Sequence, residues 1–481
     1  MRDRYPANDL APGVRLQLLL LLVATISVNA ANWPQFRGEG GLGTAEGSAP
    51  IHFGPGSNLL WKAEVPAGNS SPVIWGDRLF LTASPGSTLE TLCLDRKSGA
   101  VVWSVPAPTV PIEKTHRIGS PASSTPVTDG KRLCVYFGSF GLLAYDFSGK
   151  ELWRKSLPAP VVEFGSGGSP ILAGGNLIQI CDQDTGSFLI AVNPADGRTV
   201  WRVERPAFRR SFATPFVWKH DGREELIVPG SIWLKSYDPK DGAENWTVSG
   251  TSRVATASPT SGDGLLFTSS WNIGGDEDSR VAMEPFAEFA ALNDRNKDGK
   301  LTQQEIPAGP VRDRFSQMDL DKDNIVTGEE WEEMRQMFAR AGNAVIAIRP
   351  GGRGDITKTH LAWRVTRSLP YVSSPIVSAG RLFTMKNGGL LSCYQAATGR
   401  PIIQDERVGV TGDFYASGVA AGNHVYFTSQ SGTVTVVTAK DDPKVVATNP
   451  VGEHVMATPA IVDGVVYLRG AKNLWAFGNA K

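Results

Sequence analysis

Short runs of apolar residues, separated by turns rich in glycine and charged residues, make up most of the chain after residue 57. Each run is about six residues long, which is too short for a typical helix, so the pattern predicts β-strands joined by hairpins. In each group the first strand follows a Ser/Thr-Pro pair, and a tight turn such as Gly76-Asp77-Arg78 leads into the second strand. A polar turn with glycine ends the third strand, and the fourth strand carries tryptophan. Four such strands are typical of one β-propeller blade.

The Ser/Thr-Pro pairs define a repeat. Their prolines fall at positions 72, 126, 170, 215 and 259, at intervals of 54, 44, 45 and 44 residues, whereas Pro375 follows only after 116. Pro459 marks another unit, and Ser417-Gly418 is a degenerate eighth copy. About 65 to 70 residues are therefore inserted into the fifth unit. We predict an all-β fold, an eight-bladed β-propeller of four-stranded blades, with a small α-helical insertion in the fifth blade.

The two ends of the repeat region complement each other. The last unit stops after Leu474-Trp475-Ala476-Phe477 without a fourth strand, while residues 58–65 match a fourth strand that has no preceding blade. We expect the N-terminal strand to complete the last blade and close the ring, which would remove an exposed sheet edge.

The chain begins with an export pattern. Arg2, Arg4 and Arg15 precede the apolar run 16–28, and Val28-Asn29-Ala30 suits signal cleavage. The run is too short to span a bilayer comfortably. We therefore predict a signal peptide at 1–30, a periplasmic or secreted protein, and no transmembrane segment after cleavage. The predicted domains are propeller at 31–275, an inserted module at 276–342, and propeller again at 343–481.

Composition restricts the partners and the redox chemistry. The 48 basic and 48 acidic residues balance, so no overall field would attract nucleic acid. Four cysteines lie far apart within apolar runs, which favours buried free thiols and offers no zinc or redox pair. They are Cys93, Cys134, Cys181 and Cys393.

Most fourth strands follow a turn of the form Asp-x-x-x-Gly and carry a tryptophan. These repeats resemble the quinoprotein alcohol dehydrogenase-like propellers over residues 58–275 and 343–478. The resemblance implies that the tryptophan rings pack between neighbouring blades as structural wedges. Units six and seven lack the tryptophan, so their packing should differ. The tryptophans in the motif are Trp61, Trp103, Trp153, Trp201, Trp246 and Trp363.

The insertion holds two acidic segments of twelve residues, 294–305 and 319–330. Both resemble EF-hand loops, in which positions 1, 3, 5, 7, 9 and 12 supply the oxygen ligands that Ca²⁺ requires. Gly299 and Asn324 occupy position 6, which turns in a left-handed conformation. Leu301 and Val326 occupy the apolar position through which paired loops meet. The predicted ligands are Asp294, Asn296, Asp298, Lys300, Thr302 and Glu305, then Asp319, Asp321, Asp323, Ile325, Thr327 and Glu330.

Pro307 and Pro310 follow the first loop closely, so its exit helix must be very short. That geometry does not suit a sensor that swings its helices apart. A structural or constitutively occupied calcium site fits the sequence better.

Residues just before the Ser/Thr-Pro openings should surround the central funnel of the propeller. They would give a basic, aromatic-lined mouth for an anionic ligand, although loop charges are often merely solvated. The funnel candidates are His116, Arg117, Arg209, Arg210, Arg253, Tyr371, Tyr415 and His454.

Two functions remain open. The first is a calcium-binding scaffold in the cell envelope, because similar propellers act there as assembly factors, with envelope proteins or an extracellular polymer as partner. The alternative implied by the resemblance is an oxidoreductase dependent on pyrroloquinoline quinone. True quinoprotein dehydrogenases carry an adjacent cysteine pair and a Glu/Asn/Asp set for an active-site calcium, and this chain lacks the pair. We therefore favour the scaffold and assign no catalytic residue.

Overall fold

The computed structural model describes Met1, residues 31–276 and residues 280–479. The chain divides into two units, Met1–Ala30 and Ala31–Lys481, and the description below concerns the second. The predicted signal peptide falls on residues 2–30, outside the described residues. Within the described ranges, no helix has the length and apolar character needed to cross a membrane.

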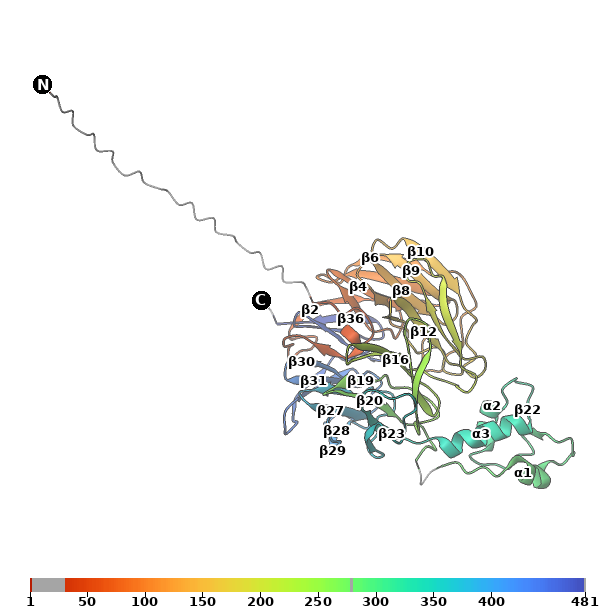
Figure 1. The fold of residues 1–481 in the computed structure, drawn as a ribbon. Coiled ribbons are helices and arrows are strands. Elements are labelled where there is room, and N and C mark those ends of the chain that lie inside the picture. The colour runs from red at the N-terminus through yellow and green to blue at the C-terminus, as the bar shows by residue number, and fades with distance from the viewer. Residues whose placement is uncertain (2–30, 277–279, 480–481) are drawn as a thin grey trace. The chain divides into compact units, whose positions relative to one another are not determined.

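Eight sheets of four or five strands correspond to the eight predicted blades. Within each blade the neighbouring strands pair antiparallel, and short turns join most of them (Figure 1). Blades 1 to 4 are β3 (Val73–Trp75), β4 (Arg78–Ala83), β5 (Glu90–Asp95), β6 (Val101–Pro106); β7 (Val127–Thr128), β8 (Arg132–Phe137), β9 (Gly141–Asp146), β10 (Glu151–Ser156); β11 (Ile171–Ala173), β12 (Asn176–Cys181), β13 (Phe188–Val192), β14 (Thr199–Glu204); and β15 (Phe216–His220), β16 (Arg223–Pro229), β17 (Trp233–Tyr237), β18 (Glu244–Ser249).

Blades 5 to 8 follow the same plan with two variations. Blade 5 contains the insertion, and blade 8 takes its outer strand from the N-terminal side of the chain. Their strands are β19 (Thr260–Gly262), β20 (Leu265–Ser270), β23 (Ala344–Ile348), β25 (Leu361–Val365); β26 (Ile376–Ser378), β27 (Arg381–Lys386), β28 (Leu390–Gln395), β29 (Pro401–Arg407); β30 (Val419–Ala421), β31 (His424–Thr428), β32 (Thr433–Thr438), β33 (Val445–Pro450); and β34 (Ala460–Val462), β35 (Val465–Arg469), β36 (Asn473–Phe477), β2 (Leu59–Glu64).

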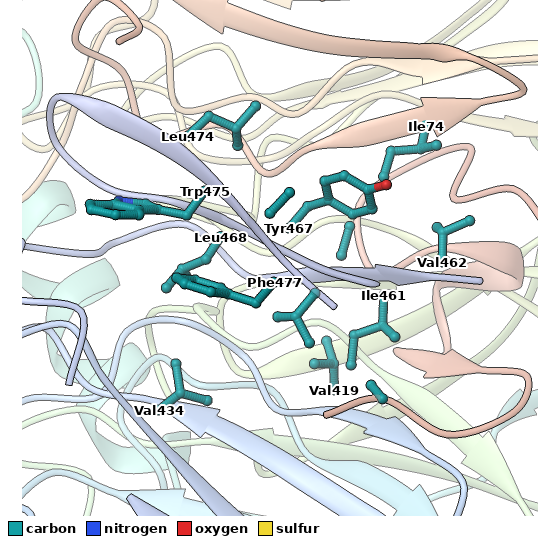
Figure 2. Packing of buried hydrophobic residues seen from close by; sticks show 14 of the residues in the cluster. Ile74, Val419, Val434, Ile461, Val462, Tyr467, Leu468, Leu474, Trp475 and Phe477 are labelled. Atoms are coloured by element: carbon teal, nitrogen blue, oxygen red, sulfur yellow. The ribbon is translucent and has the colours of Figure 1, made fainter. Parts of the chain in front are cut away.

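The ring closes as the sequence predicts. Strand β2 pairs antiparallel with β36, with Trp61 opposite Ala476 and Lys62 opposite Trp475. Behind this pair lies the largest buried apolar cluster, in which Phe477 and Tyr467 of blade 8 pack with Ile74 of blade 1 (Figure 2). Pairing of segments from the two ends of the described chain therefore covers an edge that would otherwise be open.

A closed circle of hydrogen bonds joins the inner ends of the blades. In each blade the backbone N–H of the residue that precedes the first strand donates to the hydroxyl of the equivalent residue in the next blade, at 2.9–3.1 Å. All eight residues are buried. The circle satisfies buried donors that the short inner strands leave free. Its members are Ser71, Thr125, Ser169, Thr214, Ser258, Ser374, Ser417 and Thr458.

Residues 31–57 cross several blades, a path that nothing in the repeat pattern predicts. Trp33 bridges to Ile74 in blade 1. Arg37, fully buried, donates through Nη2 to the carbonyl of Pro375 beside blade 6 at 2.7 Å. The short strand β1 (Thr44–Ala45) then adds in parallel to β30 of blade 7. The segment thus ties together blades that lie apart in the ring.

The tryptophans pack between blades at five of the six motif positions. Each of these five indoles donates to a backbone carbonyl in the turn between the third and fourth strands of the next blade, at 2.9–3.2 Å. The glycine of that turn lies against the ring, close enough that a Cβ would clash. This confirms the structural role for Trp61, Trp103, Trp153, Trp201 and Trp363.

Trp246 departs from the predicted packing. Its Nε1 donates to Glu225 in its own blade at 2.6 Å, and its side chain is fully buried. The cause lies in blade 5, where a long connection between β23 and β25 replaces the usual turn. That connection contains β24 (Gly354–Asp355), which pairs in parallel with β18 and adds a fifth strand to blade 4.

Candidate functional site

The insertion in blade 5 is a small helical unit with its own core. It contains α1 (Phe286–Asn293), α2 (Phe315–Met318) and α3 (Gly328–Arg340) between the paired ends of β20 and β23. Phe315 and Trp331 are buried in its apolar cluster. Turns occupy the residues after Glu305, where the two prolines stand, so the expected helix is absent from this described stretch.

The first acidic segment is a tight loop built around two carboxylates. Asp294 accepts hydrogen bonds from the backbone N–H of Lys297 and of Gly299, at 2.7 and 2.9 Å. At the other end of the loop, Glu305 accepts from the N–H and hydroxyl of Thr302 and from the N–H of Arg295. Hydrogen bonds from Thr302 lower the pKa of Glu305, so this carboxylate is charged at neutral pH.

The second acidic segment repeats these contacts. Glu330 accepts from the N–H of Leu320 at 2.8 Å and from the N–H and hydroxyl of Thr327 at 2.8 and 2.9 Å. Asp319 is 4% exposed, and its Oδ1 is a buried carboxylate oxygen without a hydrogen-bond partner. Carboxylate oxygens of Asp319, Asp321 and Asp323 lie within 4.8 Å of one another.

Three clustered carboxylates repel one another unless a cation or protons neutralise them. A buried carboxylate oxygen without a hydrogen-bond partner is costly because it has lost its contacts with water. The residues of the second segment therefore fit a hard cation with oxygen ligands such as Ca²⁺. The first segment offers the same types of residue in the same turn, with Asn296 in place of the second aspartate.

The two segments are joined back to back. β21 (Leu301–Thr302) pairs antiparallel with β22 (Ile325–Val326), and Leu301 lies opposite Val326 with both side chains fully buried. The residues at position 6, Gly299 and Asn324, have φ angles of 77° and 66°, which is the left-handed conformation expected there. The amide N–H groups of Lys300 and Ile325 donate to Asp298 and Asp323 respectively. All twelve predicted ligand positions therefore lie in two equivalent, paired loops.

The second candidate site is a central cavity of about 530 Å³. All eight residues of the hydroxyl circle line it, together with aromatic side chains such as Phe164 and Phe212. Phe36, from the segment that crosses the blades, also lines the cavity. Both the size and the mixture of apolar and polar lining suit a small-molecule ligand.

Four of the eight predicted funnel residues line this cavity, namely Arg210, Arg253, Tyr371 and Tyr415. The tyrosine rings contact each other with centroids 6.4 Å apart. Burial, together with the charge of Asp413, raises the pKa of both tyrosines, in Tyr415 to about 12. Both phenols are therefore neutral at physiological pH.

The other four predicted funnel residues do not line the cavity. His116 packs against the lining residue Phe164 with ring centroids 4.8 Å apart and the rings tilted by 48°. Arg209 turns toward the insertion, where it pairs with Glu333 at 2.8 Å. Arg117 and His454 are exposed. Sequence position before the Ser/Thr-Pro pair was therefore a partial guide, because these loops differ in length and direction.

The insertion contributes lining residues that the sequence reasoning missed. Asp313, Arg314 and Gln317 all line the cavity, and Gln317 accepts a hydrogen bond from Nη1 of Arg253 at 2.8 Å. Arg314 and Gln317 stand outside the loops that mark the calcium motif, and no sequence signal connects them to a cavity in the ring.

The lining does not fit a quinone with its calcium. The four cysteines are free and come from separate blades, so no adjacent pair is present in the chain. Of the acidic lining residues, Glu163 is paired with Arg210 and Asp313 is exposed. Among the described residues, the lining thus does not provide the clustered oxygen ligands that the resemblance to quinoprotein dehydrogenases implies, and no quinone-dependent step is derived from it.

Comparison with known proteins agrees with the repeat architecture. A family model, PQQ_2, described as "Outer membrane protein assembly factor BamB", matches residues 90–348, more than half of the chain. The chain belongs to this family. The matched PQQ_2 region runs from β5 in blade 1 to β23 in blade 5 and so spans the insertion. A search of the curated proteins finds no match.

Solved structures share the fold of this PQQ_2 chain. BamB from Moraxella catarrhalis is 12% identical with a TM-score of 0.54, covering 87% of this chain and 98% of that one. A quinohemoprotein alcohol dehydrogenase from Pseudomonas putida HK5 is 12% identical with a TM-score of 0.53, covering 94% and 81%. The enzyme of the same type from Comamonas testosteroni is 13% identical with a TM-score of 0.52, covering 94% and 82%. At these identities the similarity concerns the fold alone.

Proposed function

We propose that this protein is an exported calcium-binding β-propeller that acts as a binding or assembly scaffold in the cell envelope. The export signal predicted at residues 1–30 and the family description of an outer membrane assembly factor support the location. The paired acidic loops support the proposal of calcium binding. The observation that carries the proposal is the unpaired, buried Asp319 Oδ1 beside two further carboxylates.

Calcium in these loops would be structural. The pairing of β20 with β23 holds both ends of the insertion in blade 5, and its helices pack around one core, which disfavours a large separation of the helices on loading. Extracellular calcium sites of this type bind with dissociation constants of about 10⁻⁴ to 10⁻³ M and are filled outside the cell. We therefore place calcium as a stabiliser of the insertion rather than as a signal.

Calorimetric titration of the mature protein with Ca²⁺ tests this assignment. We expect two binding events in the wild type, and weakening by at least about tenfold in a Glu305→Gln, Glu330→Gln double variant, because each change removes a bidentate ligand. A Glu288→Gln, Glu329→Gln double variant is the matched control, since neither residue belongs to the six ligand positions of a loop. No heat from the wild type after thorough calcium removal would refute the calcium function.

The scaffold role requires a macromolecular partner from the envelope. The central cavity, with its mixed apolar and polar lining, is a concave feature that could hold part of such a partner, and the half-buried Arg253 and Tyr371 supply polar groups to it. Arg209 and Arg210 are less suitable because both already pair with carboxylates of the chain.

Chemical crosslinking in envelope extract tests the scaffold role. We expect a defined crosslinked partner that is lost in an Arg253→Gln, Tyr371→Ala variant and retained in an Arg117→Gln, His454→Ala variant, whose residues lie outside the cavity lining. A partner that binds all three proteins equally would place the docking surface elsewhere on the propeller. The absence of any reproducible partner would argue against the scaffold function.

A further inference from the structure

Two arginines that line the central cavity have no acidic partner. Within residues 31–276 and 280–479, no carboxylate forms an ion pair with Arg253 or Arg314 within 4.0 Å. Arg253 donates through Nη1 to Gln317, and its Nε is buried without a partner. Arg314 donates through Nη1 to the carbonyl of Pro310, and its Nε is likewise buried and unpartnered. Guanidinium donors left in this state are costly.

The third arginine of the cavity, Arg210, has carboxylate partners for its guanidinium group. Arg210 binds Asp184 through Nε and Nη2 at 2.5 and 2.9 Å, and Glu163 through Nη1 at 3.0 Å. Burial disfavours the charge of Arg210, but these hydrogen bonds outweigh it and raise its pKa. Among the residues that the structure describes, carboxylates thus pair with Arg210 and with neither of the other two arginines of the cavity.

Arg253 and Arg314 lie close to the same aromatic ring. Their guanidinium carbons stand 5.3 and 5.7 Å from the ring centroid of Phe338 in α3. Burial, followed by the like charges of Arg314 and Arg210, lowers the pKa of Arg253 to about 10, so it remains a cation at neutral pH. The ring offers some cation–π stabilisation. It does not provide the hydrogen-bond acceptors that both side chains lack.

The acidic lining residues do not fill this role. Glu163 is committed to Arg210, and the exposed Asp313 forms no ion pair with either arginine. Asn272, also in the lining, has a buried Oδ1 without a partner. The cavity therefore contains unpaired donors from two arginines, one further free polar atom, and aromatic walls. A cavity of about 530 Å³ with a few convergent polar groups is of the kind that holds small ligands.

We propose that the central cavity binds a small organic anion, whose carboxylate or phosphate group is held by Arg253 of the propeller and Arg314 of the insertion. The planar guanidinium groups suit either kind of oxyanion, and charge-assisted hydrogen bonds of this type are stronger than neutral ones. The apolar body of the ligand contacts Phe164, Phe212 and Tyr371. Because Arg314 comes from the insertion, this site is complete only when the insertion is folded.

A matched pair of aromatic probes tests the proposal. Naphthalene carboxylate and naphthalene methanol have nearly the same ring surface and differ in charge, and the fluorescence of both reports binding. We expect the carboxylate to bind at least about tenfold more tightly than the alcohol, as a charge-assisted hydrogen bond of about 1.5–3 kcal/mol implies. The preference should fall with added salt. Inorganic phosphate and citrate should both displace the carboxylate probe, and the concentration that each requires shows whether the site prefers phosphate or carboxylate.

Three single variants locate the site. Arg253→Gln and Arg314→Gln should each reduce the preference for the carboxylate about tenfold or more, because each removes one of the two guanidinium groups. Arg312→Gln removes the same charge two positions from Arg314, outside the cavity lining, and should leave the preference unchanged. Thermal melting confirms that each variant is folded, and Arg314→Gln keeps the test valid if Arg253→Gln is unstable. Equal binding of the two probes, or an unchanged preference in both variants, would overturn the proposal.

Discussion

The backbone N–H of Thr458 donates a hydrogen bond of 3.1 Å to the hydroxyl of Ser71, although the two residues are 387 positions apart. This is the contact that closes the circle of eight hydroxyl residues between blade 8 and blade 1. Both residues are buried, at 3% and 2% exposure. The bond is therefore shielded from bulk solvent.

Ser71→Ala should destabilise the propeller by about 1–3 kcal/mol, because it leaves the Thr458 amide buried without an acceptor. Chemical denaturation gives the difference as a shift in midpoint at unchanged slope. Ser104→Ala is the matched control, since its hydroxyl bonds to Glu90 on an exposed surface, and it should change stability by less than about 0.5 kcal/mol. Equal effects of the two substitutions would mean that the circle contributes little to stability.

Gly99 allows the closing strand to pack against blade 1. Its φ is +74°, and a Cβ at this position would lie 2.6 Å from the ring of Trp61. Gly76 has a similar φ of +57° but open space around it. Gly76→Ala should cost about 1–2 kcal/mol for the left-handed backbone alone, and Gly99→Ala about 1–3 kcal/mol more for the clash. Thermal melting of both variants measures the difference, and equal losses would show that Trp61 can move aside freely.

The hydroxyl circle and the tryptophans differ in how far the sequence predicts them. The Ser/Thr-Pro period identified the blades, and the resemblance identified the interblade tryptophans. The hydrogen bonds from a backbone N–H to a hydroxyl 44 residues further along the chain could be predicted only with the relative placement of neighbouring blades. Trp246 was wrongly predicted because its local sequence matches the motif, whereas its environment is decided by the long 349–360 connection in the following blade. The length of this connection is the sequence feature that could have indicated a different environment for Trp246.

The two candidate sites also differ in how far the sequence predicts them. The acidic loops are local, so the two segments of twelve consecutive residues were sufficient to predict the pairing of Leu301 with Val326 and the left-handed turns at Gly299 and Asn324. The cavity is assembled from several blades and the insertion. Its composition depends on the direction of each loop, which is why Arg314 and Gln317 were missed, and why Arg209 was placed in it wrongly.

Glu113 predicts a pH dependence of stability. Its Oε2 accepts two hydrogen bonds from Ser166, while its Oε1 is buried without a partner. Burial raises the pKa of Glu113 to about 7, against hydrogen bonds that lower it. Since the folded state holds its proton more tightly than the unfolded state, stability should fall as the pH rises from about 4.5 to about 7.

Glu113→Gln removes this titrating group. The variant should gain stability relative to the wild type on going from pH 5 to pH 8, by up to about 3 kcal/mol, which corresponds to the shift in pKa. Denaturation at both pH values measures the difference. Glu46→Gln, at an exposed site, is the control and should show no such trend. A constant difference between Glu113→Gln and wild type across this range would contradict the buried, protonated carboxyl.

The insertion should be removable without loss of the ring. The N–H of Asn343 donates to the carbonyl of Gly275 at 3.3 Å, so the two ends of the insertion already meet. Ser270 at the end of β20 lies opposite Ala344 at the start of β23. Replacing residues 276–342 by two glycines therefore closes a short hairpin connection in blade 5. We expect a folded propeller with the same strand content by circular dichroism, no calcium binding by calorimetry, and no preference for the carboxylate probe, since Arg314 is gone.

Deletion of residues 31–57 removes fewer residues than deletion of the insertion, but we expect it to destabilise the propeller. This segment buries Trp33 and Phe53 at 1% and 4% exposure against blades 1 and 8, and loss of one such aromatic side chain costs about 3–5 kcal/mol. The truncated protein should unfold at a clearly lower denaturant concentration or fail to accumulate.

If removal of residues 276–342 instead unfolds the ring, the ion pair of Arg209 with Glu333 and the other contacts of the insertion would contribute to the stability of the propeller. Calcium would then support the whole fold rather than one appended unit.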